Sequence, residues 1–168
     1  MSLQYASVDD LLALCGEREL TELRPSADGL SFDVASVQQA IDAAQAVVDS
    51  YIGQVYALPM RGCERIVGVD TVLTAPPLLQ VVALDIARFG LHRDLTDTHE
   101  VYRRHKQARA DLDAVAQGKR ALVCPWGGPA PGQTLEGARS AQNADSPGPA
   151  LSYSGAMDSG SLDLTGYA

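Results

Sequence analysis

Cysteine is scarce in this chain, and its spacing excludes the disulfide-rich and zinc-binding classes of small protein. The 168 residues contain three cysteines, Cys15, Cys63 and Cys124. Their number is odd, and no two of them lie close enough for a metal-ligand or redox motif. We therefore expect structural or incidental thiols in a reducing compartment.

Histidine is equally scarce, and no motif of enzyme chemistry accompanies it. His92, His99 and His105 fall within 14 residues, without a His-Glu-x-x-His or Asp-x-Asp-x-Asp pattern. Two of them are six residues apart, which does not place them on one helical face. Residues 127–129, Gly-Gly-Pro, lack the strand and helix that frame a phosphate loop. The sequence predicts a protein that is not an enzyme and that holds no metal or cofactor.

Basic residues and long apolar runs are also lacking. The chain has 13 Lys and Arg against 21 Asp and Glu, a net charge of −8. An acidic chain is a poor candidate for tight binding to nucleic-acid phosphates, although it could line a passage that DNA crosses without sticking. No apolar run approaches the roughly 20 residues of a membrane helix. Residues 1–7 lack the basic and apolar regions of a secretory signal, so we expect no membrane contact and assembly in the cytoplasm.

What the chain does have is a sharp change of composition near Gly118. Residues 121–168 contain eight glycines and five prolines, 13 of 48, which is typical of a segment without its own core. We predict a helical body over 1–120 and an extended tail over 121–168. Apolar residues recur in the tail, so we expect it to order on a partner through Trp126, Leu151, Tyr153, Leu162, Leu164 and Tyr167. Alternation in the tail favours strand addition to a partner's sheet; plain disorder is the alternative.

Apolar periodicity predicts a mainly α body, a small bundle of two short and three longer helices. Ser7 and Asp10 form a capping box for the first short helix, which ends at Cys15, and the second covers 17–23. The longer helices are expected to end near residues 57, 93 and 118. Their expected starting signals are, in order, Asp33, Pro77, and either Asp97 or Thr98. Residues 60–75 are rich in β-branched side chains and predict a β-hairpin or extended loop.

Two groups of charged residues could act between subunits. Asp85 and Arg88 are three residues apart on a helix, which allows a polar contact across a subunit interface or an ion pair within one chain; we favour the ion pair. Residues 103–109 hold the main basic concentration, including Arg103 and Arg104. DNA contact is one interpretation, and a solvated face or a patch against an acidic neighbouring subunit is the favoured one.

Short segments spread along the body match a known pattern in order and spacing. They are Tyr5–Leu11, Ile41–Ala44, Val48–Ile52, Tyr56–Pro59, Pro76–Leu79, Asp85–Phe89, Tyr102 and Leu112–Lys119. On these segments, residues 5–120 resemble the Mu-like phage family of small head–tail connector proteins. The chain departs from the family in two places. The loop at 60–75 is longer, so Ile66 and Val67 are expected to contact a neighbouring subunit, and the tail matches no family motif.

The resemblance implies a helical adaptor that forms a twelve-fold ring beneath the portal of a phage head. Such a ring sits in the neck of the virion, joins the portal to a stopper or tail-completion protein, and lets DNA pass through without sequence-specific binding. In related adaptors the C-terminal segment reaches into the portal, which implies a partner for the tail. Two alternatives remain: a stopper or head-completion protein of the same neck, and a helical DNA-binding regulator that uses residues 103–109.

Overall fold

The computed structural model describes residues 3–93, 95–127 and 131–135. Within them the chain is mainly α-helical with one two-stranded sheet, as the sequence predicts. Two short helices, α1 (Val8–Cys15) and α2 (Glu17–Leu23), precede the larger elements. Ser7 caps α1 by accepting the N–H of Asp10, whose carboxylate accepts the N–H of Ser7. This is the predicted capping box. Gly16, with a φ of 81°, separates the two helices in a conformation that favours glycine.

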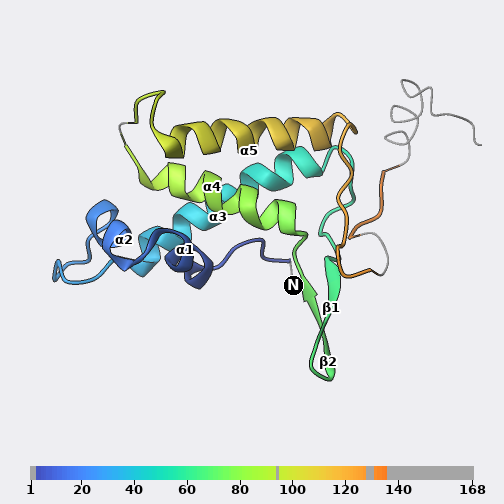
Figure 1. Ribbon diagram of the computed structural model, residues 1–168, viewed down its shortest axis with the longest axis horizontal. Helices are drawn as coiled ribbons and strands as arrows, with labels where there is room; N and C mark the ends of the chain where they lie inside the picture. The colour runs from blue at the N-terminus through green and yellow to red at the C-terminus, as the bar shows by residue number, and fades with distance from the viewer. Residues whose placement is uncertain (1–2, 94, 128–130, 136–168) are drawn as a thin grey trace, which may run out of the picture.

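Three longer helices, α3 (Val34–Ile52), α4 (Pro77–Leu91) and α5 (Glu100–Ala116), pack against one another and enclose the core. Figure 1 shows α4 and α5 side by side and running in opposite directions. The largest fully buried side chains come from all the helices: Leu11, Leu20, Val37, Ile41, Val48, Ile52, Leu79, Val82, Leu91, Val101, Leu112 and Val115. No helix in the part of the chain that the structure describes is both long and apolar enough to span a bilayer.

The end of α3 differs from the prediction. The helix stops at Ile52 rather than near residue 57. The N–H of Ala57 donates to the carbonyl of Gln133 at 2.8 Å instead of to the preceding helical turn. Val55 and Tyr56 remain buried, because the irregular backbone still packs on the core. Apolar spacing continues past the helix, but the chain leaves it at Gly53, and the N–H groups of Gln54 and Val55 donate to carbonyls three residues back.

The last residue of α4 and the first residue of α5 also differ slightly from the prediction. Helix α4 ends at Leu91, two residues before the expected Arg93. Helix α5 begins at Glu100, and its cap is His99 rather than Asp97 or Thr98. The imidazole Nδ1 of His99 accepts the N–H of Val101 at 3.2 Å, so a ring nitrogen takes the place of the expected side-chain oxygen.

The segment at 60–75 is a β-hairpin, as predicted. Strands β1 (Cys63–Val67) and β2 (Asp70–Thr74) pair antiparallel, with Val67 opposite Asp70 and Cys63 opposite Thr74. The two-residue turn contains Gly68 with a φ of 67°, a conformation that tight hairpins favour at glycine. Figure 1 shows the hairpin projecting from the helical body, away from α4 and α5.

The start of the expected tail packs on the body. Leu122 is buried and donates its N–H to the hydroxyl of Tyr56 at 3.1 Å. The N–H of Leu135 donates to the carbonyl of Val55, and that of Gly62 donates to the carbonyl of Pro131. The packed body therefore extends beyond the expected division at residue 120.

A disulfide joins Cys63 at the start of the hairpin to Cys124. This corrects the expectation that both are structural or incidental thiols, and Cys15 alone remains a free thiol. The sequence did not predict this disulfide, because Cys63 and Cys124 are 61 positions apart in the chain and only the fold brings them together. The bond ties the base of the hairpin to the chain that follows α5, residues 121–127 and 131–135, which we call the returning segment.

Candidate interaction site

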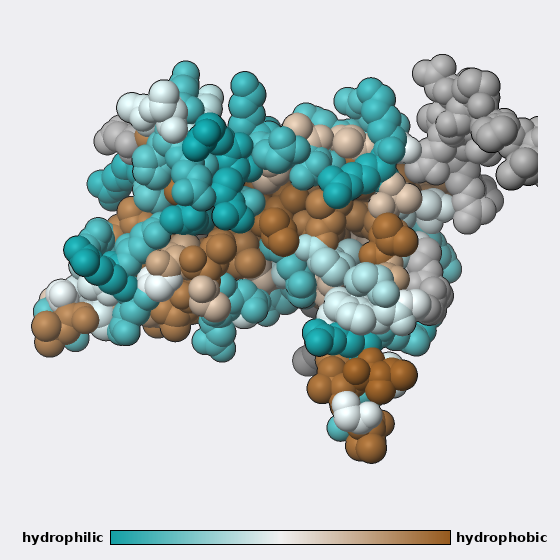
Figure 2. Space-filling view, in the orientation of Figure 1, coloured by the Kyte–Doolittle hydropathy of each residue, from teal (hydrophilic) through white to brown (hydrophobic). Residues whose placement is uncertain are grey.

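The hairpin exposes a group of aliphatic side chains on both of its faces. Ile66 is 76% exposed, Val67 is 54% exposed and Val69, in the turn, is 99% exposed. Val72 and Leu73 on β2 are about half exposed. We call these five side chains the hairpin tip. Figure 2 shows hydrophobic surface gathered at the projecting hairpin, with hydrophilic surface between it and the hydrophobic band that crosses the body. Contiguous exposed apolar surface of this kind marks an interaction site or an aggregation hazard.

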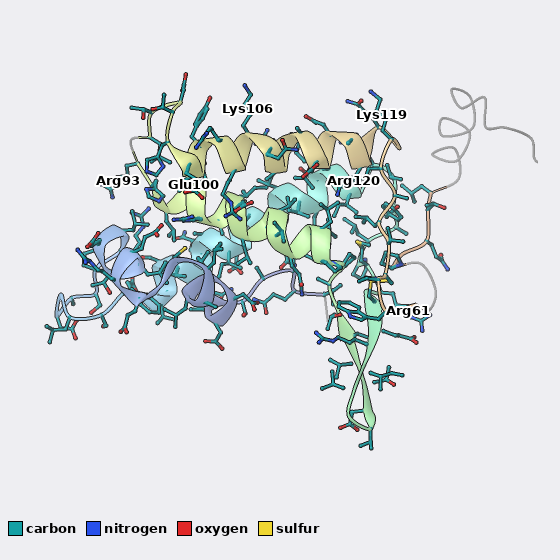
Figure 3. The ribbon with its side chains drawn as sticks, in the orientation of Figure 1. Arg61, Arg93, Glu100, Lys106, Lys119 and Arg120 are labelled. Carbon is teal, nitrogen blue, oxygen red and sulfur yellow. A yellow bond between two sulfur atoms is a disulfide. The ribbon has the colours of Figure 1, made fainter. Side chains whose placement is uncertain are left out.

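The base of the hairpin is fixed, unlike its tip. The guanidinium of Arg65 lies 5.1 Å from the ring centroid of Trp126, a cation–π contact. Arg61, which Figure 3 labels at the base, forms an ion pair with Glu64. The disulfide at Cys63 anchors the same end. These contacts hold the hairpin from its base to the middle of β1, where Ile66 lies beside Trp126, and they leave the tip largely exposed among the residues that the structure describes.

Trp126 is the one expected tail residue that falls in the described part of the chain. It is 42% exposed and packs beside the hairpin. The others lie outside the described residues: Leu151, Tyr153, Leu162, Leu164 and Tyr167. Their proposed binding to a partner stays a prediction.

The expected ion pair between Asp85 and Arg88 is not formed. Asp85, which is 7% exposed, accepts a hydrogen bond from Arg104 on α5 at 2.9 Å. Arg88 instead donates two hydrogen bonds of 2.8 Å to Glu19 on α2. Residues three apart lie on neighbouring ridges of one helix, and here each ridge meets a different neighbour. Asp85, Arg88 and Arg104 thus have charged partners within their own chain.

The pKa values of the two paired carboxyl groups are shifted in opposite directions, one by its partner and the other by burial. The hydrogen bonds from Arg88 hold the pKa of Glu19 below its usual value. Burial raises the pKa of Asp85, and the nearby Arg104 opposes that rise. His92 lies 3.6 Å from Glu19, and burial lowers the pKa of the imidazole. The two pairs join α2 to α4 and α4 to α5.

The remaining basic residues of α5 face outward. Figure 3 shows Lys106 pointing away from the bundle, and Arg103 is exposed and forms no ion pair within the described residues. Arg109 donates to the hydroxyl of Tyr51 at 3.0 Å and lies over its ring. This arrangement fits the favoured interpretation of residues 103–109 as a solvated face.

A groove that the sequence analysis missed lies between α3, α4 and α5. Its volume is about 480 Å³, and its floor includes Ala40, Ala43, Val47, Ile86 and Phe89. Ala40 and Ala43 on α3 and Gly90 on α4 carry little or no side chain on this surface, and a Cβ at Gly90 would meet no atom within 4 Å. The sequence did contain a signal for this groove. On α3, a second row of small or apolar residues at helical spacing lies beside the buried row, namely Ser36, Ala40, Ala43 and Val47.

The rim of the groove carries positive charge. Arg24, His105 and Arg109 line it, and no Asp or Glu is among its lining residues. His105 stacks on Phe89 with ring centroids 3.9 Å apart, and burial lowers its pKa.

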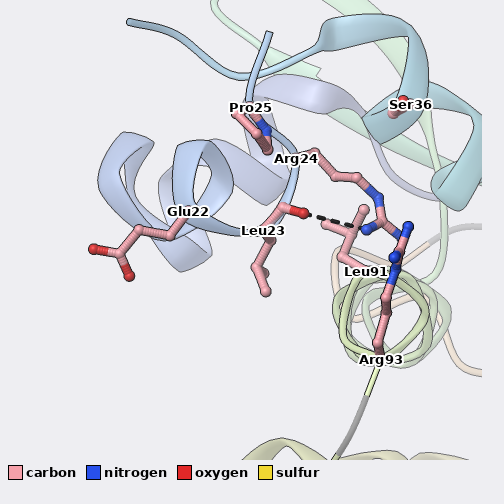
Figure 4. Close-up of a pocket in the computed structure, with 7 residues that line it drawn as sticks. All are labelled: Glu22, Leu23, Arg24, Pro25, Ser36, Leu91 and Arg93. Atoms are coloured by element: carbon pink, nitrogen blue, oxygen red, sulfur yellow. Dashed lines mark hydrogen bonds between the residues drawn. The ribbon is translucent and has the colours of Figure 1, made fainter. Parts of the chain in front are cut away.

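An adjoining pocket shares Arg24 with the groove, and Arg93 lines it too. In Figure 4 both guanidinium groups point into the same space while Glu22 points away. Arg24 donates to the carbonyl of Leu23, and neither arginine has a carboxylate partner within the described part of the chain.

The charged groups do not gather into a metal site. In residues 3–93, 95–127 and 131–135, no group of three or more His, Cys, Asp or Glu side chains is arranged to hold a metal ion. The described surface carries an aliphatic hairpin tip, a groove with apolar lining and a rim with arginine side chains.

Comparison with known proteins identifies the family. None of the curated proteins matches the chain. The model of the family described as "Bacteriophage Mu, Gp36" matches residues 5–140, which covers the whole helical body, the hairpin and the returning segment. The match continues past residue 120, where the resemblance was expected to end. The chain therefore belongs to the bacteriophage Mu Gp36 family, which indicates a structural or morphogenetic role in a phage.

Proposed function

We propose that the chain is a subunit of a homo-oligomeric ring in the neck of a phage particle. The ring joins the portal to the stopper or tail and lets DNA pass through its lumen; twelve copies match the symmetry of the adaptors that the family resembles. The observation that carries the proposal is the exposed hairpin tip on a member of a phage family. A body this small gains from burying such a surface against other subunits.

The charge of the chain suits a conduit. Each subunit carries a net charge of −8, so a closed ring of many copies holds strong negative charge around its opening. Such a lumen repels phosphate and limits DNA adhesion during passage. This role needs no catalysis, and we propose that the protein is not an enzyme.

The segment after Leu135 is proposed to bind the portal. It carries Leu151, Tyr153, Leu162, Leu164 and Tyr167, which supply apolar contacts to a chain rich in glycine and proline. A segment that orders on binding gives low affinity per copy. Many copies on one ring raise the avidity strongly, so attachment depends on a completed portal.

Electron microscopy of the full-length chain mixed with its purified portal tests the proposal. We expect rings seated on the portal, and loss of that seating when residues 136–168 are deleted. Density that joins the stopper but never the portal would assign the chain to the stopper or head-completion position instead. Absence of the chain from finished particles would overturn a structural role.

A second candidate, a DNA-binding regulator, is favoured by one observation. Arg24, Arg93, Arg103 and Arg109 have no carboxylate partner among the described residues. Real phosphate contacts give an affinity that falls steeply with salt. A gel-shift series from low to physiological salt decides the matter: we expect weak, sequence-independent retention that vanishes at physiological salt.

A further inference from the structure

The hairpin tip needs a cover that its own body does not supply. A two-stranded hairpin alone is marginally stable in water, and this one is fixed only at its base by Cys63 and Arg65. Its two faces expose Ile66, Val67 and Val72 to solvent. An element of this shape acts as a knob, and the complementary partner must offer an apolar hollow.

The groove between α3, α4 and α5 is such a hollow. Alanine, glycine and other apolar residues make up more than half of its lining, beside the polar groups already described, and its volume of about 480 Å³ lies within the range of ligand pockets. The groove is open to solvent in the described part of the chain. The molecule thus carries both a knob and a hole.

The two features cannot meet within one chain. The hairpin runs directly into the first turn of α4 at Pro77, whereas the groove includes Phe89 and Gly90 in its last turn. Twelve residues of helix separate these positions by about 18 Å, and the hairpin points away from the body (Figure 1). A knob and a hole at opposite ends of one subunit make a head-to-tail contact, which closes into a ring when the rotation allows.

The charges of the two surfaces are complementary. Asp70, next to the turn, is exposed and forms no ion pair within the described residues. It is the one acidic residue between Arg65 and Thr74. The rim of the groove carries Arg24, which has no carboxylate partner in the described part. A carboxylate on the knob and a guanidinium on the rim fix the direction in which the knob enters.

We propose that the hairpin tip of one copy inserts into the α3–α4–α5 groove of the next copy, with Asp70 paired to Arg24 of that copy. This deepens the proposed function, on which it rests, by naming the surface that joins neighbouring subunits of the ring. Val69 occupies the floor of the groove beside Ala43, and the side chains around it exclude water from the ion pair.

Sedimentation velocity of the full-length chain over a concentration series tests the contact. Val69→Asp on the knob and Ala43→Trp in the hole each weaken self-association by at least about tenfold, because each blocks the apolar insertion. The matched control is Leu30→Asp, an aliphatic side chain of 85% exposure outside both surfaces. It leaves association unchanged. Val69 is fully exposed, so circular dichroism and the unfolding midpoint of its variant stay as in the unmodified chain.

A charge exchange tests the assigned pair. Asp70→Arg and Arg24→Asp each weaken association, and the combined variant restores it at least in part. A covalent test stands beside it: the Val69→Cys, Ala43→Cys double variant yields a ladder of linked oligomers on oxidation, while each single variant does not. Absence of rescue overturns the Asp70–Arg24 pair, and absence of the ladder overturns the docking of tip into groove.

The outcomes for this contact and for the proposed function are separable. A chain that stays monomeric at every concentration and on the portal overturns the contact. If tip variants still enter particles as the unmodified chain does, the neck function stands and the contact falls. If the chain forms rings through the tip but is absent from particles, the contact stands and the neck function falls. Loss of binding to another protein, with self-association intact, assigns the tip to that protein and overturns the contact.

Discussion

Removing the disulfide between Cys63 and Cys124 is expected to lower the free energy of unfolding by about 4 kcal/mol. The bond closes a loop with a sequence separation of 61 residues that contains β1, β2, α4 and α5. The chain-entropy relation for a loop of this length gives about 4 kcal/mol at 25 °C. Opening the loop raises the entropy of the unfolded chain while most native contacts remain, so the variant folds but unfolds at lower denaturant.

Urea unfolding of the Cys63→Ala, Cys124→Ala double variant measures the effect, alongside the unmodified chain with and without reductant. Two probes separate local from global change. Trp126 is the sole tryptophan and lies two residues from Cys124, so its fluorescence reports release of the returning segment. Circular dichroism at 222 nm reports the helices.

Cys15→Ser serves as the control. Burial raises the pKa of the Cys15 thiol to about 11, so this group is almost entirely protonated and unreactive at neutral pH. Its variant should respond to reductant as the unmodified chain does. The reasoning is refuted if reductant and the double variant leave the helical midpoint unchanged, or if Trp126 fluorescence changes while the helices keep their stability. In the second case the bond would hold only the segment after α5, and the entropy of the large loop would contribute nothing.

Three further predictions concern the core and its charged pairs. Leu112→Ala, at a fully buried position, should cost about 2–5 kcal/mol through lost transfer energy and a cavity, measured as a shift of the urea midpoint. Glu19→Gln breaks the paired hydrogen bonds from Arg88 and should cost about 1–2 kcal/mol at pH 7. The folded-state pKa of Glu19 is depressed. Its contribution to the free energy of unfolding is therefore present above its unfolded pKa of about 4.3 and is lost as the pH falls through the folded-state pKa. A series of urea midpoints from pH 7 to 3 should be flatter for the variant. The pKa of Asp85 is raised by burial, so its contribution has the opposite sign: stability falls as the pH rises from about 3.9 through the raised value, and Asp85→Asn should remove that fall. A variant series that falls as steeply as the unmodified chain would contradict the assignment of this pH dependence to buried Asp85.

Local signals predicted the elements of the fold well. The capping box at Ser7 and the glycine at residue 16 act within one helical turn, so the bounds of α1 and α2 follow from neighbouring residues. The β-branched residues at 60–75 and the turn at Gly68 likewise specify the hairpin locally. The end of α3 was mispredicted, because Val55 and Tyr56 continue the apolar spacing although the chain has already left the helix at Gly53. The N–H of Ala57 then pairs with Gln133, a contact that no local pattern contains.

Part of the candidate interaction site could likewise be predicted from sequence, and part of it could not. Ile66 and Val67 were named from the extra length of the 60–75 loop relative to the family, and both are exposed in the structure; their contact with a neighbouring subunit stays a prediction. The groove could not be predicted, because it arises where small residues of α3 face Phe89 and His105 from two other helices. The partners of Asp85 and Arg88 were also beyond reach, since spacing along one helix does not say which neighbouring helix each side chain meets.

Caps, apolar periods and turn residues act over a few positions, so the mainly helical body and the hairpin could be predicted from sequence. The acidic charge follows from composition, and the family likeness from short segments in order. The tertiary structure alone decided that Cys63 meets Cys124, that residues 121–127 and 131–135 belong to the packed body, and that a groove opens opposite the hairpin. These features depend on residues tens of positions apart, whose proximity is fixed only when the three long helices have packed.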